Sequence, residues 1–395
     1  MSEAPRPRLI TPRFALVVTA GLAYFFSLGM LLPVVPLYVE GPLSHGKLAV
    51  GIAVGAFSVG AVLLRPWAGM IGDRFGRRVL IVVGALVVAA SGGLYHVATN
   101  IGLLVLVRIL GGIGEAAFFV GAGTMVTDLA PEERRGEAIS YWSVAVYGGL
   151  ALGPWLGETL VSGDHYGQVW TVSAVLALTA AAVGFFTTET VTTNDPDLVR
   201  GPLINRAAIL PGSVLFLGLI GLAGYTSFIA LYVREIGMHD SRSVLALYAG
   251  VILSVRILGA RIPDRIGAKR AGTFATITGT VGLLIIASTP HPVALMIGTV
   301  VFAVGMSLLY PAMLMLSLAD LPANERGSAV GTVSSFFDLS QGLGAAILGG
   351  VAALTGYSGA FVAAAALTMV GLVVLRTASG DRGEARAERV TEAAA

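Results

Sequence analysis

Long apolar runs follow one another along nearly the whole chain, separated by short polar turns. A helix that crosses a lipid bilayer needs about 20 mostly apolar residues, and we predict twelve such helices. They cover residues 14–39, 50–72, 79–98, 101–124, 137–161, 167–187, 207–234, 243–263, 271–289, 292–318, 327–354 and 357–376. The fold class is therefore an all-α integral membrane protein.

The composition excludes several other classes of protein. Hydrophobic residues make up 55% and charged residues 12% of the 395, whereas soluble domains carry about 25% charged residues. The basic residues lie in short turns and form no basic face, so we expect no nucleic-acid partner. There is no cysteine, and the five histidines are scattered, so we predict no disulfide, metal site or cofactor. We find no nucleophile with a base and no phosphate-binding loop, so the sequence does not indicate an enzyme or an ATP-driven pump.

A charged turn at residues 69–78, GMIGDRFGRR, recurs in the second half of the chain. Asp73 corresponds to Asp264 and Gly76 to Gly267, and the offset is 191 positions, as 264 − 73 gives. Two parallel copies of one plan are typical of membrane carriers. We predict an N-terminal six-helix bundle (1–187), a cytoplasmic linker (188–206), a C-terminal six-helix bundle (207–376) and a partly disordered cytoplasmic tail (377–395).

The distribution of Lys and Arg predicts the orientation in the membrane. With the N-terminus inside, most basic turn residues are cytoplasmic, and only Lys47, Arg234 and Arg242 fall outside. We therefore expect a multi-pass protein of the plasma (inner) membrane with both termini in the cytoplasm.

At the charged turn the chain resembles the major facilitator superfamily. The signature G-x-x-x-D-R-x-G-R-R is matched by Gly69, Asp73, Arg74, Gly76, Arg77 and Arg78. The resemblance implies two six-helix bundles with pseudo-two-fold symmetry and transport by alternating access. Three further patterns resemble the twelve-helix drug/proton antiporters, namely LGMLLPVVPLY in the first span, RILGGIGEA in the fourth and GLALGPWLG in the fifth.

The fifth span carries glycine at every fourth position, Gly149, Gly153 and Gly157, with Pro154 between them. Such spacing places the glycines on one helix face, where another backbone can approach closely, and the proline can bend the helix. One interpretation is a tight helix contact without further purpose. The resemblance implies an interface with the other half that controls which side opens, and we favour this interpretation.

Ionisable residues inside a bilayer are costly and indicate function. Arg65 and Arg256 lie near the predicted cytoplasmic ends of their spans, and we interpret both mainly as parts of the turns. Arg108 and Glu115, seven residues apart, share a helix face at about 10 Å along the axis. We hypothesise that Glu115 or Asp338 takes up the proton while Arg108 tunes it; a structural ion pair of Arg108 with a carboxylate of another helix is the alternative.

The charged turn is expected to act as a cytoplasmic gate. Asp73 would meet the N-terminus of the helix that begins near Arg326, and Arg77 would pair with Asp128. The simpler alternative is that the arginines only set the topology. Aromatic side chains near mid-membrane are the candidates for a substrate cavity, namely Tyr24, Phe25, Trp142, Tyr147, Tyr225, Tyr310 and Phe337.

The predicted function is a proton-coupled secondary transporter, an efflux antiporter for small amphipathic drugs, sugars or metabolites. Its expected partners are the substrate, protons and the lipid bilayer, and we expect a monomer. A proton/substrate symporter for uptake on the same fold is the first alternative. A non-transporting membrane sensor or assembly partner is the second.

Overall fold

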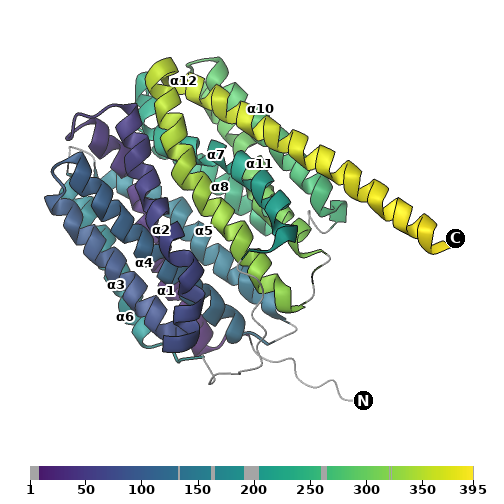
Figure 1. Cartoon of the computed structure of the whole chain (residues 1–395). Coiled ribbons are helices and arrows are strands. Elements are labelled where there is room, and N and C mark those ends of the chain that lie inside the picture. The colour runs from purple at the N-terminus through teal and green to yellow at the C-terminus, as the bar shows by residue number, and fades with distance from the viewer. Residues whose placement is uncertain are drawn as a thin grey trace. The chain divides into compact units, whose positions relative to one another are not determined.

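The computed structural model of the protein describes residues 9–131, 134–161, 165–190, 204–258, 265–319, 321 and 323–394. Over these ranges the chain forms helices joined by short connections and contains no strand (Figure 1). The helices are α1 (Pro12–Glu40), α2 (Lys47–Phe75), α3 (Arg77–Leu94) with the short η1 (Tyr95–Val97), α4 (Ile101–Asp128), α5 (Arg135–Leu160), α6 (Tyr166–Phe185), α7 (Arg206–Glu235), α8 (Arg242–Leu258), α10 (Ala268–Ser288), α11 (Pro292–Leu318) and α12 (Ala323–Ala394).

Helix α12 consists of two helices, because Gly356 between them has a positive φ of 78° and a ψ of 178°. With its two parts counted separately, the described residues have a helix at each of the twelve predicted spans. The second part continues to Ala394, where the sequence predicts a partly disordered tail. The tail is rich in alanine, glutamate and arginine, which are strong helix formers, and this propensity accounts for the helix.

Nine described stretches are long and apolar enough to cross a membrane. The last of them, Ala329–Thr377, includes both parts of α12 around Gly356. Helices α5 and α8 are not among the nine. As described, α8 has only 17 residues, fewer than the about 20 that a span needs, and the rest of its predicted span (259–263) lies outside the described residues.

Some helices begin at residues whose side chains accept from their first free N–H groups. Thr11 caps α1 by accepting from Phe14 N at 3.2 Å, and Pro12 follows at the first helical position. Asn100 caps α4 in the same way, accepting from Leu103 N at 2.9 Å. Side-chain caps of this kind, with proline at the first position, fix where a helix starts.

The chain divides into two compact units. Unit 1 consists of Met1–Leu198 and Ser227–Leu253, and unit 2 of Val199–Thr226 and Ser254–Ala395. Helices α7 and α8 therefore each contribute residues to both units. The predicted bundles divided by a linker at 188–206 remain a prediction, and the two compact units differ from them by placing Ser227–Leu253 with the first six helices.

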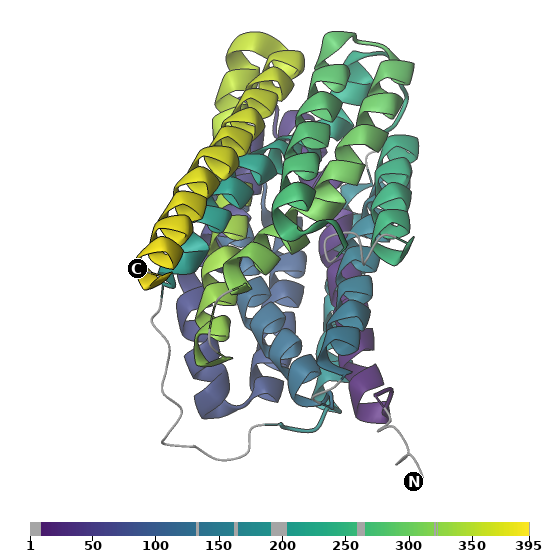
Figure 2. The same cartoon turned by 90° about the vertical axis from the view of Figure 1, so that its right-hand side faces the viewer.

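Within unit 1, α1 packs against α5 and α6, α4 packs against α2 and α3, and α3 packs against α6 (Figure 1). The core of this unit is a cluster of buried apolar side chains from α1, α3, α4, α5 and α6. Within unit 2, α10 packs against α11 and α12, and Figure 2 shows α10 and α11 side by side in green. Glycine permits this approach, since a Cβ on Gly305 would lie 2.7 Å from the Ala275 carbonyl oxygen.

Candidate functional site

A buried ion pair joins α2 and α4 in unit 1. The Nη2 atom of Arg65 donates to Oε2 of Glu115 at 2.8 Å. The two side chains are only 9% and 11% exposed, and the Arg65 guanidinium also lies over the ring of Phe119, 5.2 Å from its centroid. Two charges removed from water in this way are stable only as a pair, because either one alone bears the full cost of desolvation.

Glycines bring the two helices close enough for this pair. A Cβ on Gly112 of α4 would collide with the carbonyl group of Phe57 on α2, and one on Gly60 would collide with the carbonyl group of Ile109. Backbones that touch in this way are typical of small residues in membrane helices. The pair lies on the same two helices as this glycine contact.

The predicted tuning of Glu115 by Arg108 stays a prediction, and no described contact joins the two side chains. Arg108 Nε donates to the Ala53 carbonyl at 3.1 Å and Nη2 to the Val54 carbonyl at 3.2 Å, and the guanidinium lies over the Phe57 ring at 4.6 Å. These acceptors hold Arg108 on the backbone of α2. The alternative, an ion pair of Arg108 with a carboxylate of another helix, does not occur among the described contacts either.

Arg65 is the cation that contacts Glu115. The interpretation of Arg65 as mainly a part of the turn is wrong, because its side chain reaches the buried Glu115. A long side chain near a helix end can reach the membrane surface, but it can equally reach inward to a buried carboxylate. Only the rotation of α2 about its own axis decides between the two, and this rotation is not visible in the sequence.

Tyr24 of α1 lies beside this pair. Its ring is fully buried and stacks on Phe118 of α4, with the centroids 3.7 Å apart and the planes at 7°. Glu115 precedes Phe118 by three residues, so the two share a face of α4. Within the described part of the chain the Tyr24 hydroxyl has no hydrogen-bond partner, which is unusual for a buried polar group.

Three of the predicted cavity residues are packed in the core of unit 1. Tyr24, Phe25 and Trp142 all belong to its cluster of buried apolar side chains, and Phe25 meets Trp142 edge to face at 5.8 Å. In this structure they act as packing residues, not as an open lining. Most membrane-protein aromatics do the same, and their type does not distinguish the two roles.

The remaining cavity candidates lie elsewhere. Tyr147 is half-buried on α5 of unit 1. In unit 2, the buried Tyr225 shares a hydrogen bond with Thr299 at 3.2 Å, and Tyr310 meets Phe337 edge to face at 6.0 Å. Their role in binding a substrate stays a prediction.

The second proton-coupling candidate, Asp338, lies on α12 in unit 2 and is 6% exposed. A buried carboxylate on a membrane helix is expensive and indicates function. The two carboxylate candidates thus belong to different compact units.

The charged turn connects α2 and α3 at Gly76. Its φ of 104° is a left-handed conformation that favours glycine, and a Cβ there would collide with the carboxylate of Glu189. That carboxylate accepts from Arg77 N at 2.9 Å and from Arg78 N at 3.1 Å. It therefore caps the N-terminus of α3, where an anion is favoured by free N–H groups and the helix dipole.

The predicted pair of Arg77 and Asp128 is confirmed as a contact, with Nε to Oδ2 at 3.1 Å. The same carboxylate oxygen accepts from Thr190 Oγ1 at 2.8 Å. Glu189 and Thr190 were missed by the sequence analysis, because both fall in the segment interpreted as a linker. The only signal for them is a carboxylate that directly follows an apolar span.

The other residues of the turn make fewer described contacts. The guanidinium of Arg74 lies over Phe75 at 5.3 Å and that of Arg78 over Phe185 at 4.8 Å. A Cβ on Gly69 would meet nothing within 4 Å. The predicted contact of Asp73 with the helix near Arg326 involves side chains that lie outside the described ones.

The glycine face of α5 packs on α1. A Cβ on Gly149 would lie 2.5 Å from Phe26 N, and one on Gly153 would lie 2.7 Å from Gly29 Cα. One on Gly157 would collide with the Met30 carbonyl. The partner of this face is therefore a helix of the same unit, contrary to the preferred interpretation of an interface with the other half.

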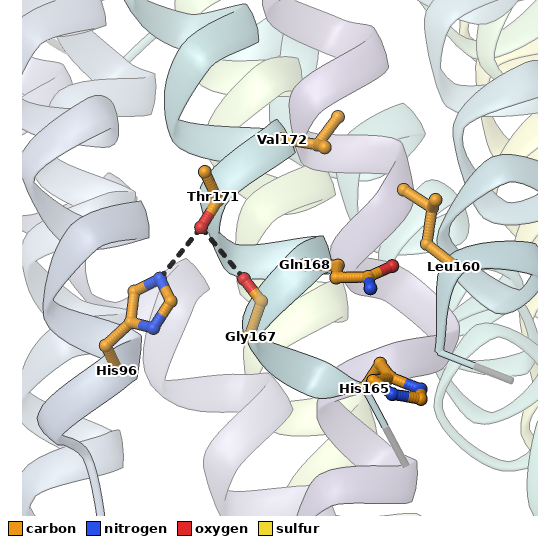
Figure 3. Close-up of a pocket in the computed structure, with 7 residues that line it drawn as sticks. All are labelled: His96, Leu160, His165, Gly167, Gln168, Thr171 and Val172. Atoms are coloured by element: carbon orange, nitrogen blue, oxygen red, sulfur yellow. Dashed lines mark hydrogen bonds between the residues drawn. The ribbon is translucent and has the colours of Figure 1, made fainter. Parts of the chain in front are cut away.

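An open hollow of about 590 Å³ lies where α5 ends and α6 begins (Figure 3). It is lined by His96, Leu160, His165, Gly167, Gln168, Thr171 and Val172. His96 Nε2 and Thr171 Oγ1 are 3.1 Å apart, and Thr171 donates to the Gly167 carbonyl. None of the predicted cavity residues lines this hollow. Among the described residues there is also no group of three or more side chains suited to hold a metal ion.

Comparison with known families and proteins gives consistent matches over the whole chain. The model of the Major Facilitator Superfamily matches residues 17–294 and 244–393. An uncharacterized MFS-type transporter of Salmonella typhimurium is 30% identical over 361 residues, which are 89% of this chain and 92% of the relative. One from Burkholderia pseudomallei is 27% identical over 388 residues, 94% of each chain.

Solved structures share the fold at low identity. The human organic anion transporter TETRAN has a TM-score of 0.72 at 19% identity and covers 93% of this chain and 100% of its own. The nucleoside transporter NupG, as its D323A mutant, has a TM-score of 0.75 at 13% identity and covers 92% and 99%. The predicted all-α membrane fold with twelve helices is thereby confirmed.

Proposed function

Because this chain belongs to the Major Facilitator Superfamily, and is thus a multi-pass membrane transporter rather than an enzyme, we propose that it is a proton-coupled antiporter. It would export small amphipathic molecules, drugs, sugars or metabolites, by alternating access. The observation that carries the proposal is the buried pair of Arg65 and Glu115.

A buried carboxylate in contact with a buried cation suits proton coupling. While Glu115 is ionised, the 2.8 Å contact neutralises both charges. Protonation of Glu115 would remove the charge that this contact sets against the Arg65 guanidinium, at a cost of several kcal/mol in a site of low dielectric. Protonation would therefore favour a different arrangement of α2 and α4, which is the coupling between a proton and a conformation that an antiporter needs.

Asp338 is the second carboxylate of the proposal. Its burial on α12 gives unit 2 a protonatable group of its own, so that each unit would carry one. The half-buried Tyr147, Tyr310 and Phe337 are the proposed substrate contacts.

The charged turn is the proposed cytoplasmic gate. In this proposal the protein lies in the plasma membrane, and the turn between α2 and α3 faces the cytoplasm together with both termini. The contacts of Arg77 with Asp128 and of Glu189 with the N-terminus of α3 support it, because both hold the turn in one conformation. Asp73 is the residue of the gate that would reach the other half.

Transport in proteoliposomes tests the proposal. A survey of drugs, sugars and metabolites by thermal shift identifies a substrate, and a pH-sensitive dye inside the vesicles then reports proton movement. We expect Glu115→Gln to abolish proton-driven transport, Asp338→Asn to reduce it, and Glu40→Gln, an exposed carboxylate at the end of α1, to leave it unchanged. Full proton-driven transport in both of the first two variants would refute the proposal, and substrate moving with the proton gradient would indicate a symporter.

A further inference from the structure

Glu158 is a buried carboxylate that neither the proton site nor the charged turn uses. It follows Gly157 near the end of α5 and is 3% exposed. Its Oε1 accepts from Ser241 N at 2.8 Å, and its Oε2 accepts from Ser241 Oγ at 2.7 Å. One residue of another segment thus supplies a hydrogen bond to each oxygen of this carboxylate.

Ser241 is fully buried and stands directly before α8. Its carbonyl accepts from Leu245 N at 2.9 Å, so it occupies the N-cap position of that helix. A serine there commonly turns its hydroxyl to a free N–H of its own helix, but this hydroxyl donates to Glu158 instead. The negative charge of Glu158 therefore sits at the N-terminus of α8, where the helix dipole stabilises it.

A second contact holds the same region. Lys47 at the start of α2 pairs with Glu235 at the end of α7, with Nζ to Oε2 at 3.6 Å. The α7–α8 connection, residues 236–241, is thus tied to the first helices at both of its ends. Of the two ties, the Glu158 contact is the stronger, because it is buried and its hydrogen bonds go to a charged acceptor.

The contact between Glu158 and Ser241 lies in a segment through which the chain passes from one unit to the other. Residues Ser227–Leu253 belong to unit 1, while the adjoining parts of α7 and α8 belong to unit 2. Any rearrangement of the units must therefore either bend α7 and α8 or detach this segment from α5. Detachment would break the two hydrogen bonds of Glu158, which are buried and have a charged acceptor.

We propose that Glu158 and Ser241 form a latch that holds the α7–α8 connection on unit 1 in one state of the transport cycle and releases it in the other. The latch lies at the end of unit 1 opposite to the charged turn. It rests on alternating access from the proposed function, but it requires neither proton coupling nor a particular substrate.

Distance measurements by electron paramagnetic resonance test the latch in the full-length protein in lipid nanodiscs. The chain has no cysteine, so Leu48→Cys on α2 and Ile236→Cys after α7 place two unique spin labels. We expect Glu158→Ala to raise the ratio of long to short distances about tenfold and Ser241→Ala to raise it less, because Ser241→Ala keeps the backbone N–H bond. Thr159→Ala is the matched control, since that hydroxyl donates within its own helix to Trp155 O.

An unchanged distance distribution in Glu158→Ala, or an equal change in Thr159→Ala, would overturn the latch. If Glu158→Ala does not fold, as judged by thermal unfolding, Ser241→Ala decides alone. Unchanged distances in Ser241→Ala would then overturn the proposal. The measurement needs no substrate and no pH gradient. Loss of proton coupling with intact distance changes would therefore refute only the proposed antiport.

Discussion

Replacing Arg65 alone should destabilise the protein more than replacing Arg65 and Glu115 together. Their contact is 2.8 Å long, and the side chains are 9% and 11% exposed. Removing one partner takes the opposite charge of this contact away from the other, which for a buried pair costs about 3–5 kcal/mol. Replacing both by apolar side chains of similar volume removes the desolvation cost as well as the attraction, and is often neutral.

The assay is a double-mutant cycle of Arg65→Met, Glu115→Leu and the double variant. The free energy of unfolding of the purified protein in detergent micelles is measured by denaturant titration. We expect each single variant to lose about 3–5 kcal/mol and the double variant to lie within about 1 kcal/mol of the parent, or above it. The interaction energy between the two sites, which is the sum of the two single losses less the loss of the double variant, is then at least about 5 kcal/mol.

Arg108→Met provides the matched control, since Arg108 lies on the same helix as Glu115 and donates to carbonyl groups of α2. It should lower stability by itself but show an interaction energy with Glu115→Leu below about 0.5 kcal/mol. Additive effects for Arg65 and Glu115, or an equally large interaction of Glu115 with Arg108, would refute the assignment of Arg65 as the partner.

Three further changes have expected outcomes. Tyr24→Phe should raise the unfolding temperature, because it removes a buried hydroxyl without a described partner, a gain of about 1 kcal/mol; a lower temperature would mean that the hydroxyl is satisfied. Gly76→Ala should cost about 1–3 kcal/mol through its positive φ and lower transport, whereas Gly93→Ala on α3, with open space around it, should do neither. The Arg242 guanidinium lowers the pKa of Asp240 below its ordinary 3.8, so this contribution to stability is complete above about pH 4 and is lost as the pH falls through the lowered pKa. Asp240→Asn should weaken the fall of the unfolding temperature with falling pH, measured in a series of thermal unfolding experiments. An unchanged fall in this variant would contradict the prediction.

The fold followed from the sequence because membrane helices are specified by length and polarity alone. Each apolar run had to be a helix, since a backbone in lipid must satisfy its own hydrogen bonds, and the structure has a helix at each of them. The contact of Arg77 with Asp128 was also predictable. Both residues lie at helix ends on the same side of the membrane, where few other partners are within reach.

The partner of Glu115 was not predictable in this way. Arg65 and Glu115 are 50 positions apart and lie on helices that are not consecutive, so their meeting depends on how each helix is rotated. Arg108 was assigned by its presence in a recognised pattern, but it donates to the carbonyl groups of Ala53 and Val54 and, at 3.5 Å, to the Tyr95 hydroxyl, and no pattern marks such acceptors. Glu189 escaped because capping of a helix from a distant segment has no local signal.

The contact between α1 and α5 constrains what these two helices can do in any transport cycle. Where Gly149, Gly153 and Gly157 meet the backbone of α1, no side chain lies between the two helices that could change its rotamer to absorb a displacement. Sliding by a fraction of an ångström would bring backbone atoms into collision, so the helices should move as one rigid rod. Glu158 directly follows the last of these glycines, and movement at the latch would then be transmitted along α1 to the opposite end of the unit.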